Sequence, residues 1–207
     1  MILKIYDENP NYQDVLKVVR CLEDGGIIVL PTDTLYAFAC SMNYKKSVEK
    51  MAQLKGTSLG KAKFSLLCTD ISQLSEYTKP LDKDSYQLLR TCLPGPYTFI
   101  MDANSNIPRI YQNPNKTIGL RVPHNPITHA ILEMLGHPMI ATSVRIENED
   151  MESEYLTNPE LIHEVFHRKV DMVIDGGIGE DIPSTVVDCS NSNLEVIRYG
   201  KGEIDNV

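Results

Sequence analysis

Hydrophobic positions recur along the chain with two periods, close to 3.6 in some segments and two in others. In the segment 117–122, apolar residues alternate strictly with a threonine, a glycine and an arginine, which is typical of a half-buried strand. Similar alternation or short apolar runs predict strands over 3–6, 27–30, 36–40, 64–68, 97–102, 117–122, 139–143, 170–174, 185–188 and 194–199. Helical spacing predicts helices over 10–24, 45–55, 71–77, 85–93, 127–134 and 158–169.

Capping residues mark where the first helix begins and ends. Asn9 and Pro10 predict an N-cap and a first-turn proline, and Gly25 or Gly26 predicts the end. Strands interleaved with helices predict an α/β fold, in which helices cover a sheet of mixed direction and the last two strands pair as a hairpin. Because no repeat or linker interrupts the pattern, we expect a single domain over 1–207, with no appended C-terminal domain.

Composition narrows the class of protein. The net charge of −8 argues against a protein whose main task is to coat nucleic acid. The five cysteines form no CxxC pair, so neither a disulfide framework nor a zinc ribbon is indicated. No apolar run is long enough to cross a bilayer, and no signal peptide is visible. We therefore expect a cytoplasmic protein that does not engage a membrane.

Positive charge gathers in one part of this acidic chain. The stretch 45–63 holds six lysines and one acid, Glu49. Its end, Lys55-Gly56-Thr57-Ser58-Leu59-Gly60-Lys61-Ala62-Lys63, combines glycines with lysines and therefore suits phosphate. The glycine spacing is too short for a P-loop, and no Ser or Thr follows Lys61. A mobile surface loop is the alternative interpretation of this segment.

Several polar side chains stand at the ends of predicted strands. Thr32, Asp33 and Thr34 follow a buried strand and Pro31, which indicates either a functional loop or a hydroxyl-stabilised turn. Arg121, beside Gly119 on an alternating strand, could clamp a carboxylate or a phosphate. Ser143, Ser184 and Arg198 close or flank other strands, and each hydroxyl taken alone is more often structural.

Six segments, taken in order, resemble the YrdC/YciO family, which is typified by threonylcarbamoyl-AMP synthase. They read GGIIVLPTDTLY at 25–36, LPGPYTFI at 93–100, IGLRVPHNP at 118–126, ATS at 141–143, PSTVVD at 183–188 and VIRYG at 196–200. The resemblance spans nearly the whole chain. It implies an α/β fold with an open, twisted mixed sheet, helices packed on it and a large concave cleft.

The same resemblance implies a reaction and a site. Threonylcarbamoyl-AMP synthases join L-threonine, bicarbonate and ATP, with Mg²⁺ held through the phosphates, and the product serves the modification of tRNA. We therefore expect ATP, L-threonine and bicarbonate as partners, with tRNA or double-stranded RNA as further candidates and no protein metal site. By resemblance, the residues with catalytic roles are Lys55 and Arg121, those that bind substrate are Thr32, Arg121, Ser143 and Ser184, and those that bind nucleotide are Lys55, Thr117 and Arg198.

The chain departs from the synthase pattern at three places. Thr57 stands where synthases carry the arginine of Lys-x-Arg, Ser143-Val144-Arg145 replaces Ser-Ala-Asn, and Cys68 occupies a position that is often histidine. The runs TIGLRVP at 117–123 and VDMVIDGG at 170–177 resemble the YciO branch more closely. Lys61 or Lys63 is one hypothesis for the missing cation. The alternative function is a YciO-type protein that binds nucleotide or double-stranded RNA with weak or no synthase activity.

A competing motif, HExxH, occurs at His163–His167 and is the signature of zinc peptidases. That chemistry needs both histidines on one helix face toward a cleft, with a third ligand. The apolar residues Leu161, Ile162, Val165 and Phe166 predict a buried stripe on the other side of the helix. The zinc peptidase is therefore the remote alternative.

Overall fold

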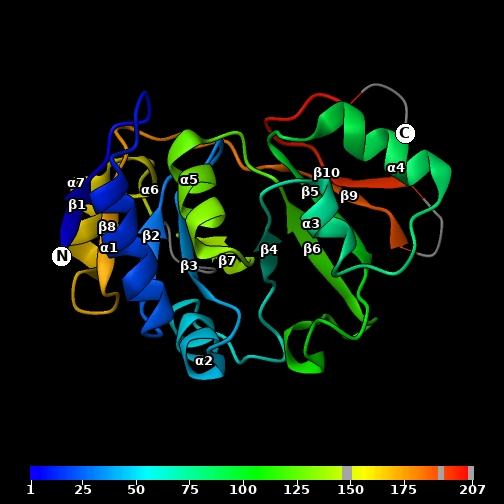
Figure 1. Cartoon of the computed structure of the whole chain (residues 1–207), viewed down its shortest axis with the longest axis horizontal. Helices are drawn as coiled ribbons and strands as arrows, with labels where there is room; N and C mark the ends of the chain where they lie inside the picture. Colours follow the sequence, from blue (N-terminus) through cyan, green and yellow to red (C-terminus); the bar gives the residue numbers. More distant parts are fainter. Residues whose placement is uncertain (146–150, 191–193, 205–207) are drawn as a thin grey trace.

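One ten-stranded sheet runs through the molecule in the order β1-β8-β2-β3-β7-β4-β6-β5-β9-β10 (Figure 1). The computed structural model describes residues 1–145, 151–190 and 194–204. The strands are β1 (Ile2–Lys4), β2 (Ile27–Leu30), β3 (Ala37–Ser41), β4 (Ser65–Leu67), β5 (Tyr97–Asp102), β6 (Thr117–Arg121), β7 (Met139–Ser143), β8 (Met172–Asp175), β9 (Thr185–Asp188) and β10 (Glu195–Arg198). Each of them lies within one or two residues of a predicted strand.

The sheet is mixed, as the sequence predicts. Strand β8 pairs parallel with β1 and β2, β4 pairs parallel with β6, and β5 pairs parallel with β9. The remaining neighbours pair antiparallel, including β9 with β10. The predicted C-terminal hairpin is therefore confirmed, and it places Arg198 opposite Val186.

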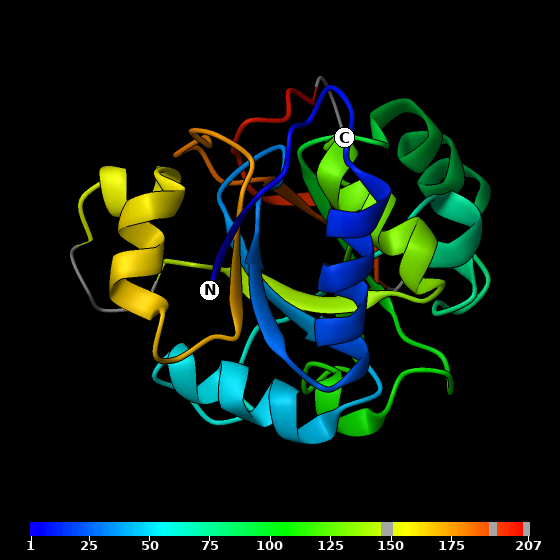
Figure 2. The ribbon, with the colours of Figure 1, turned by 60° about the vertical axis from the view of Figure 1, so that its left-hand side comes forward.

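Helices cover both faces of the first half of the sheet (Figure 2). Helices α1 and α5 pack through Val18 and Ile131 against one face, and α2 and α7 pack through Met51 and Phe166 against the other. No helix among the described residues is both long and apolar enough to span a bilayer. The helices are α1 (Tyr12–Glu23), α2 (Lys45–Leu54), α3 (Ile71–Ser75), α4 (Lys83–Cys92), α5 (Pro126–Leu135), α6 (Glu154–Thr157) and α7 (Pro159–Phe166), with a 3-10 turn at Arg109–Tyr111.

The second half of the sheet is covered differently on its two faces. Helices α3 and α4 pack through Leu74 and Leu89 on the face that α2 and α7 share. Within the described part of the chain, β5, β6 and β9 contribute no residue to the apolar cluster of the opposite face. A Cβ added to Gly119 on that face would lie 2.7 Å from the Ser65 hydroxyl oxygen and 3.1 Å from Thr98. Polar and small side chains therefore line this part of the sheet.

Two predictions about helices are wrong. Asn11, and not Asn9, caps α1 by accepting from the Gln13 amide, so Pro10 precedes the helix. Both asparagines offer a capping oxygen, and the buried stripe of α1 fixes the face of the helix but not its first residue. On α7, Val165 is 38% exposed, so it does not belong to the buried stripe.

Candidate functional site

The turn after β2 is closed by the hydroxyl group of Thr32. This hydroxyl donates to the Leu35 carbonyl at 2.8 Å and accepts from the Thr34 amide at 3.0 Å. The buried hydroxyl of Thr128, in the first turn of α5, donates to the Pro31 carbonyl at 2.6 Å. The turn is therefore hydroxyl-stabilised, and it holds Asp33 and Thr34 rigidly at the end of a buried strand.

Replacing Thr128 by valine tests how much this anchor contributes. Valine has the same shape but leaves the buried Pro31 carbonyl without this donor, so we expect a loss of about 1–3 kcal/mol in the free energy of unfolding. Urea unfolding measures it. The matched control is Thr91→Val, because the Thr91 hydroxyl donates to Gln87 on an exposed helix face. Equal stability of the two variants would contradict an anchoring role for Thr128.

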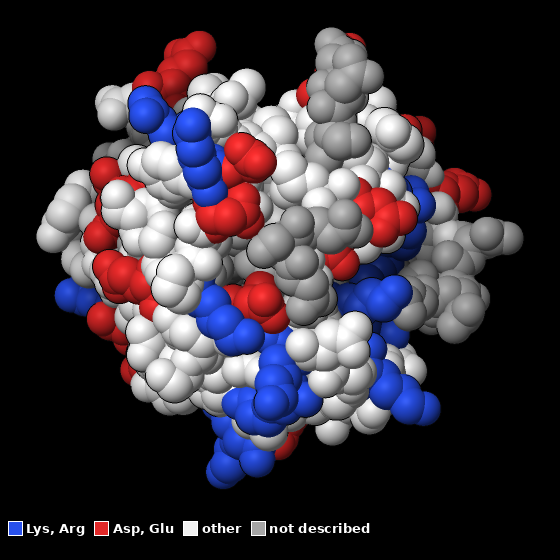
Figure 3. All heavy atoms as spheres, turned by 90° about the vertical axis from the view of Figure 1, so that its right-hand side faces the viewer, with Lys and Arg blue, Asp and Glu red and all other residues white. Residues whose placement is uncertain are grey.

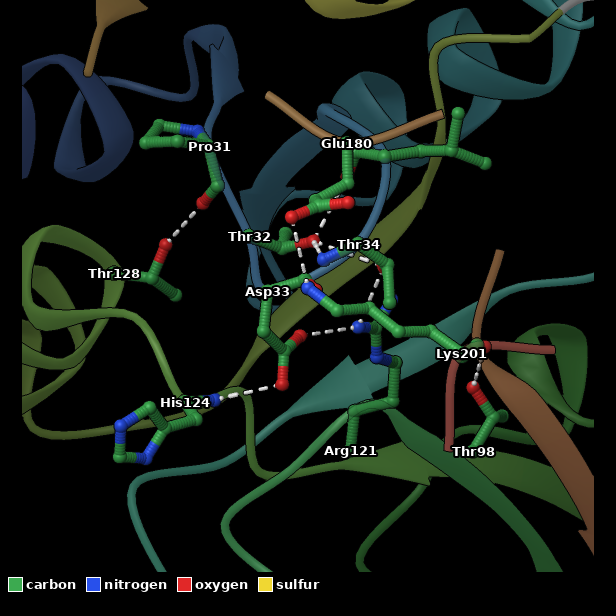
Figure 4. Close-up of polar contacts among 12 residues, drawn as sticks. Pro31, Thr32, Asp33, Thr34, Thr98, Arg121, His124, Thr128, Glu180 and Lys201 are labelled. Atoms are coloured by element: carbon green, nitrogen blue, oxygen red, sulfur yellow. Dashed lines mark hydrogen bonds and ion pairs between the residues drawn. The ribbon is translucent and has the colours of Figure 1, made fainter. Parts of the chain in front are cut away.

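An ion pair joins this turn to β6 across 88 positions of sequence (Figure 4). The Nη2 atom of Arg121 donates to Asp33 Oδ1 at 2.8 Å and to the Thr34 hydroxyl at 2.9 Å. The second carboxylate oxygen of Asp33 accepts from the His124 amide at 2.9 Å. The Arg121 and Asp33 side chains are only 12% and 8% exposed, so the pair is largely removed from water.

One edge of the Arg121 guanidinium is left without a partner. Among the described residues, its Nε atom is buried and makes no hydrogen bond. Burial lowers the pKa of Arg121, Asp33 opposes this shift, and the positive charge of nearby Arg198 adds to it. A buried donor without a partner, beside a second cation, indicates a position for an anion.

The C-terminal hairpin brings Ser184 and Arg198 to the same place. Arg198 donates from Nε and Nη2 to the Ser184 carbonyl at 3.2 and 2.8 Å. The Ser184 and Thr98 hydroxyl groups lie 2.8 Å apart. Arg121, Ser184 and Arg198, which come from three separate segments, are therefore gathered around one region of the sheet, next to the turn that contains Thr32.

Lys55 and Ser143 meet at the end of β7. The ammonium of Lys55, a residue that is only 8% exposed, donates to the Ser143 carbonyl at 3.0 Å and to the Arg145 carbonyl. The positive charge of Arg145 in turn lowers the pKa of Arg198, after burial as the larger cause. Lys55 thus lies at the end of β7, where its ammonium is bonded to two backbone carbonyls. Thr117 lies at the opposite end of β6 from Arg121, where its buried hydroxyl accepts from Asn113.

A cavity of about 420 Å³ is lined on one side by the Pro31–Asp33 turn. Its volume is within the usual range for small-molecule sites. Lys201 crosses it, donating to the Asp33 carbonyl at 3.0 Å and pairing with Glu180 at 3.1 Å (Figure 4). The other lining residues are Asp7, Pro31, Thr32, Pro94, Gly95, Pro96, His124, Asn125, Gly176, Gly177, Ile178 and Gly179.

The HExxH helix does not provide the geometry of a zinc peptidase. Helix α7 ends at Phe166, so His167 is its C-cap, and the two histidine ring centroids lie 5.6 Å apart. In the part of the chain that the structure describes, no group of three or more His, Cys, Asp or Glu side chains could hold a metal ion. Cys68 is also unsuited to bind a metal, because burial in the core raises the pKa of its thiol.

Sequence reasoning missed two residues of this site. Asp33 was noted only as part of a polar turn, although its carboxylate binds Arg121. Arg145 was noted only as a departure from a motif, although its carbonyl binds Lys55. A lone carboxylate between two threonines at the end of a buried strand was a usable signal for Asp33. No local pattern indicated Arg145, because the group that bonds to its carbonyl comes from the end of α2.

The fold and this site define an α/β protein in which guanidinium, ammonium and hydroxyl groups gather at one region of a mixed sheet. The Sua5/YciO/YrdC family model, described as Telomere recombination, matches residues 20–200. The protein YciO of Escherichia coli K12, named as uncharacterized, is 35% identical over 201 residues, which cover 97% of this chain and 95% of that protein. The chain belongs to the Sua5/YciO/YrdC family.

Solved structures show the same fold. The crystal structure of E. coli YciO matches with a TM-score of 0.90 at 35% identity, covering 98% of this chain and 97% of that one. The Sua5 protein of P. abyssi, complexed with L-threonine, matches with a TM-score of 0.87 at 21% identity, covering 97% of this chain and 57% of that one. A threonylcarbamoyl-AMP synthase of Nitrosococcus oceani is 31% identical over 134 residues, which cover 65% of this chain and 71% of that enzyme.

Proposed function

We propose that the protein is a threonylcarbamoyl-AMP synthase-like nucleotidyltransferase, which uses L-threonine, bicarbonate and ATP. The observation that carries the proposal is the Arg121 guanidinium, which is held by Asp33 on one edge and has a buried, unpartnered Nε–H on another. Arg198 lies close enough to lower its pKa. Two fixed cations of this kind suit an acid anhydride or carboxylate ligand.

The reaction brings anions together. Threonine and bicarbonate give a carbamate and water, and a carbamate oxygen then attacks the α-phosphorus of ATP. The bond from the α-phosphorus to the bridging oxygen breaks, and pyrophosphate leaves. The cations Lys55, Arg121 and Arg198 would offset the repulsion, and Mg²⁺ would enter on the phosphate oxygens as part of the substrate. Thr32, Ser143 and Ser184 are the proposed hydrogen-bonding groups for the amino acid, and Thr117 is proposed to serve the nucleotide.

Pyrophosphate release tests this function directly. We expect release that requires ATP, L-threonine and bicarbonate together, with omission of any one as the control. Radiolabelled bicarbonate should enter an acid-labile product that contains AMP. Absence of pyrophosphate at high enzyme concentration, combined with measurable nucleotide binding, would refute the synthase proposal and favour the alternative below.

The alternative is a protein that binds nucleotide or double-stranded RNA without turnover. The likeness to YciO extends over nearly the whole chain, and Thr57 stands where an arginine was expected. Figure 3 shows Lys and Arg side chains gathered on the lower part of one face, below a mainly acidic part. The candidate footprint for RNA is the lysine-rich stretch 45–63, and if it binds RNA, affinity should fall steeply with added salt. For the synthase, we also propose that the product serves the modification of tRNA.

A further inference from the structure

The two histidines of the HExxH segment have no part in the proposed function, yet they form a pair at the end of α7. The His167 amide donates to the His163 carbonyl at 2.8 Å, so the helical turn between the two residues is closed. Residues four apart on a helix lie on the same face, one above the other. The two imidazole rings accordingly lie side by side, with their centroids 5.6 Å apart.

The buried side of α7 holds this pair in place. Ile162 and Phe166 are fully buried, and the Phe166 ring meets Phe38 of β3 edge-to-face, with centroids 5.0 Å apart. This packing leaves His163 half-buried and His167 exposed. The rings are therefore open to a solute, while the core fixes the backbone that carries them.

A hydrogen bond sets the tautomer of His167. Its Nδ1 lies 3.0 Å from the Glu164 carbonyl oxygen, which can only accept, so Nδ1 carries a hydrogen. In the neutral ring the lone pair is then on Nε2. Metal-binding histidines are typically oriented in this way through their other ring nitrogen. The pKa of His163 is lowered by burial first, and then by the charges of the amino terminus and of His167, so this ring is neutral at pH 7.

We propose that His163 and His167 chelate a divalent transition-metal ion of the class that imidazole binds, namely Ni²⁺, Cu²⁺ or Zn²⁺. The site is separate from the proposed function, because the Mg²⁺ of the synthase reaction prefers oxygen ligands and does not compete for it. Within the described part of the chain, no further His, Cys, Asp or Glu completes a group of three with this pair. Water therefore fills the other coordination positions, and the site lacks the third protein ligand of a zinc peptidase.

Titration calorimetry of the untagged full chain with Ni²⁺, in the presence of Mg²⁺, tests this site. His163→Ala and His167→Ala should each weaken the affinity by about 100-fold or more, because loss of either ring turns a chelate into a single ligand. The double variant should be less than about tenfold weaker than either single variant, since the chelate is already lost. Ni²⁺ should also raise the urea midpoint of the native chain and of neither single variant, because the unfolded chain does not hold the rings together.

His129→Ala is the matched control, because His129 is an exposed histidine on α5 with no second histidine one turn away. A native chain that does not bind Ni²⁺, a single variant that binds it as tightly as the native chain, or an equal loss in His129→Ala would overturn the assignment. Loss of binding on alkylation of the cysteine thiols, with both histidines intact, would also overturn it. Neither histidine belongs to the Arg121 site, so Ni²⁺ binding and pyrophosphate release succeed or fail independently.

Discussion

Arg121→Gln is expected to lower the release of pyrophosphate by about 100-fold or more, since it removes a preorganised donor for the developing charge. It should also lower the free energy of unfolding by about 3–5 kcal/mol, because the largely buried carboxylate of Asp33 loses its counter-charge. The activity assay with all three substrates and urea unfolding measure the two effects separately.

The double variant Asp33→Asn, Arg121→Gln separates stability from chemistry. Asparagine at position 33 carries no charge, so stability should return most of the way to that of the native protein. Turnover should stay low, because the guanidinium is still absent. A double variant that is as unstable as Arg121→Gln would show that the ion pair is not the cause. Full turnover by a folded Arg121→Gln would remove Arg121 from the proposed site.

The elements of the fold follow from local pattern, and the order of the strands does not. Alternation at 117–122 is enough to identify β6, because one face of that strand packs against a core and the other does not. The same alternation carries no information on the neighbour of β6. In the sheet, β6 lies between β4 and β5. Along the sequence, helices α3 and α4 separate β4 from β5. Such choices depend on packing between distant segments, which no short window contains.

The candidate site divides in the same way. Thr32, Arg121 and Ser184 are recognisable in the sequence as polar groups at strand ends. In the structure, Thr32 and Arg121 both hydrogen-bond to Thr34, and the Ser184 hydroxyl bonds to that of Thr98. What the sequence could not supply is the partner of each group. The bond from Arg121 to Asp33 exists because the loop after β2 lies against the end of β6. The Arg145 carbonyl, two residues beyond β7, is bonded by Lys55 from the end of a helix.

Lys55→Met is expected to lower turnover by about 100-fold or more. Methionine keeps the length of the stem, so packing around this buried position should change little. The ammonium is lost, and with it the donor to the Ser143 and Arg145 carbonyls. We therefore expect ATP affinity to weaken together with turnover, because the variant loses a cation that is proposed to bind the phosphates. Calorimetry and pyrophosphate release measure the two quantities.

The comparison with Lys61→Ala, Lys63→Ala tests whether either lysine takes the place of the arginine missing at position 57. Both lysines are exposed in the loop after α2, where water screens their charge. If either lysine binds the phosphates, the double variant should lose turnover as Lys55→Met does. If neither lysine binds the phosphates, the double variant should stay within about threefold of the native protein. Because Lys55 is buried at the end of β7 and Lys61 and Lys63 are exposed, we expect the second result, and a large loss in the double variant would contradict it.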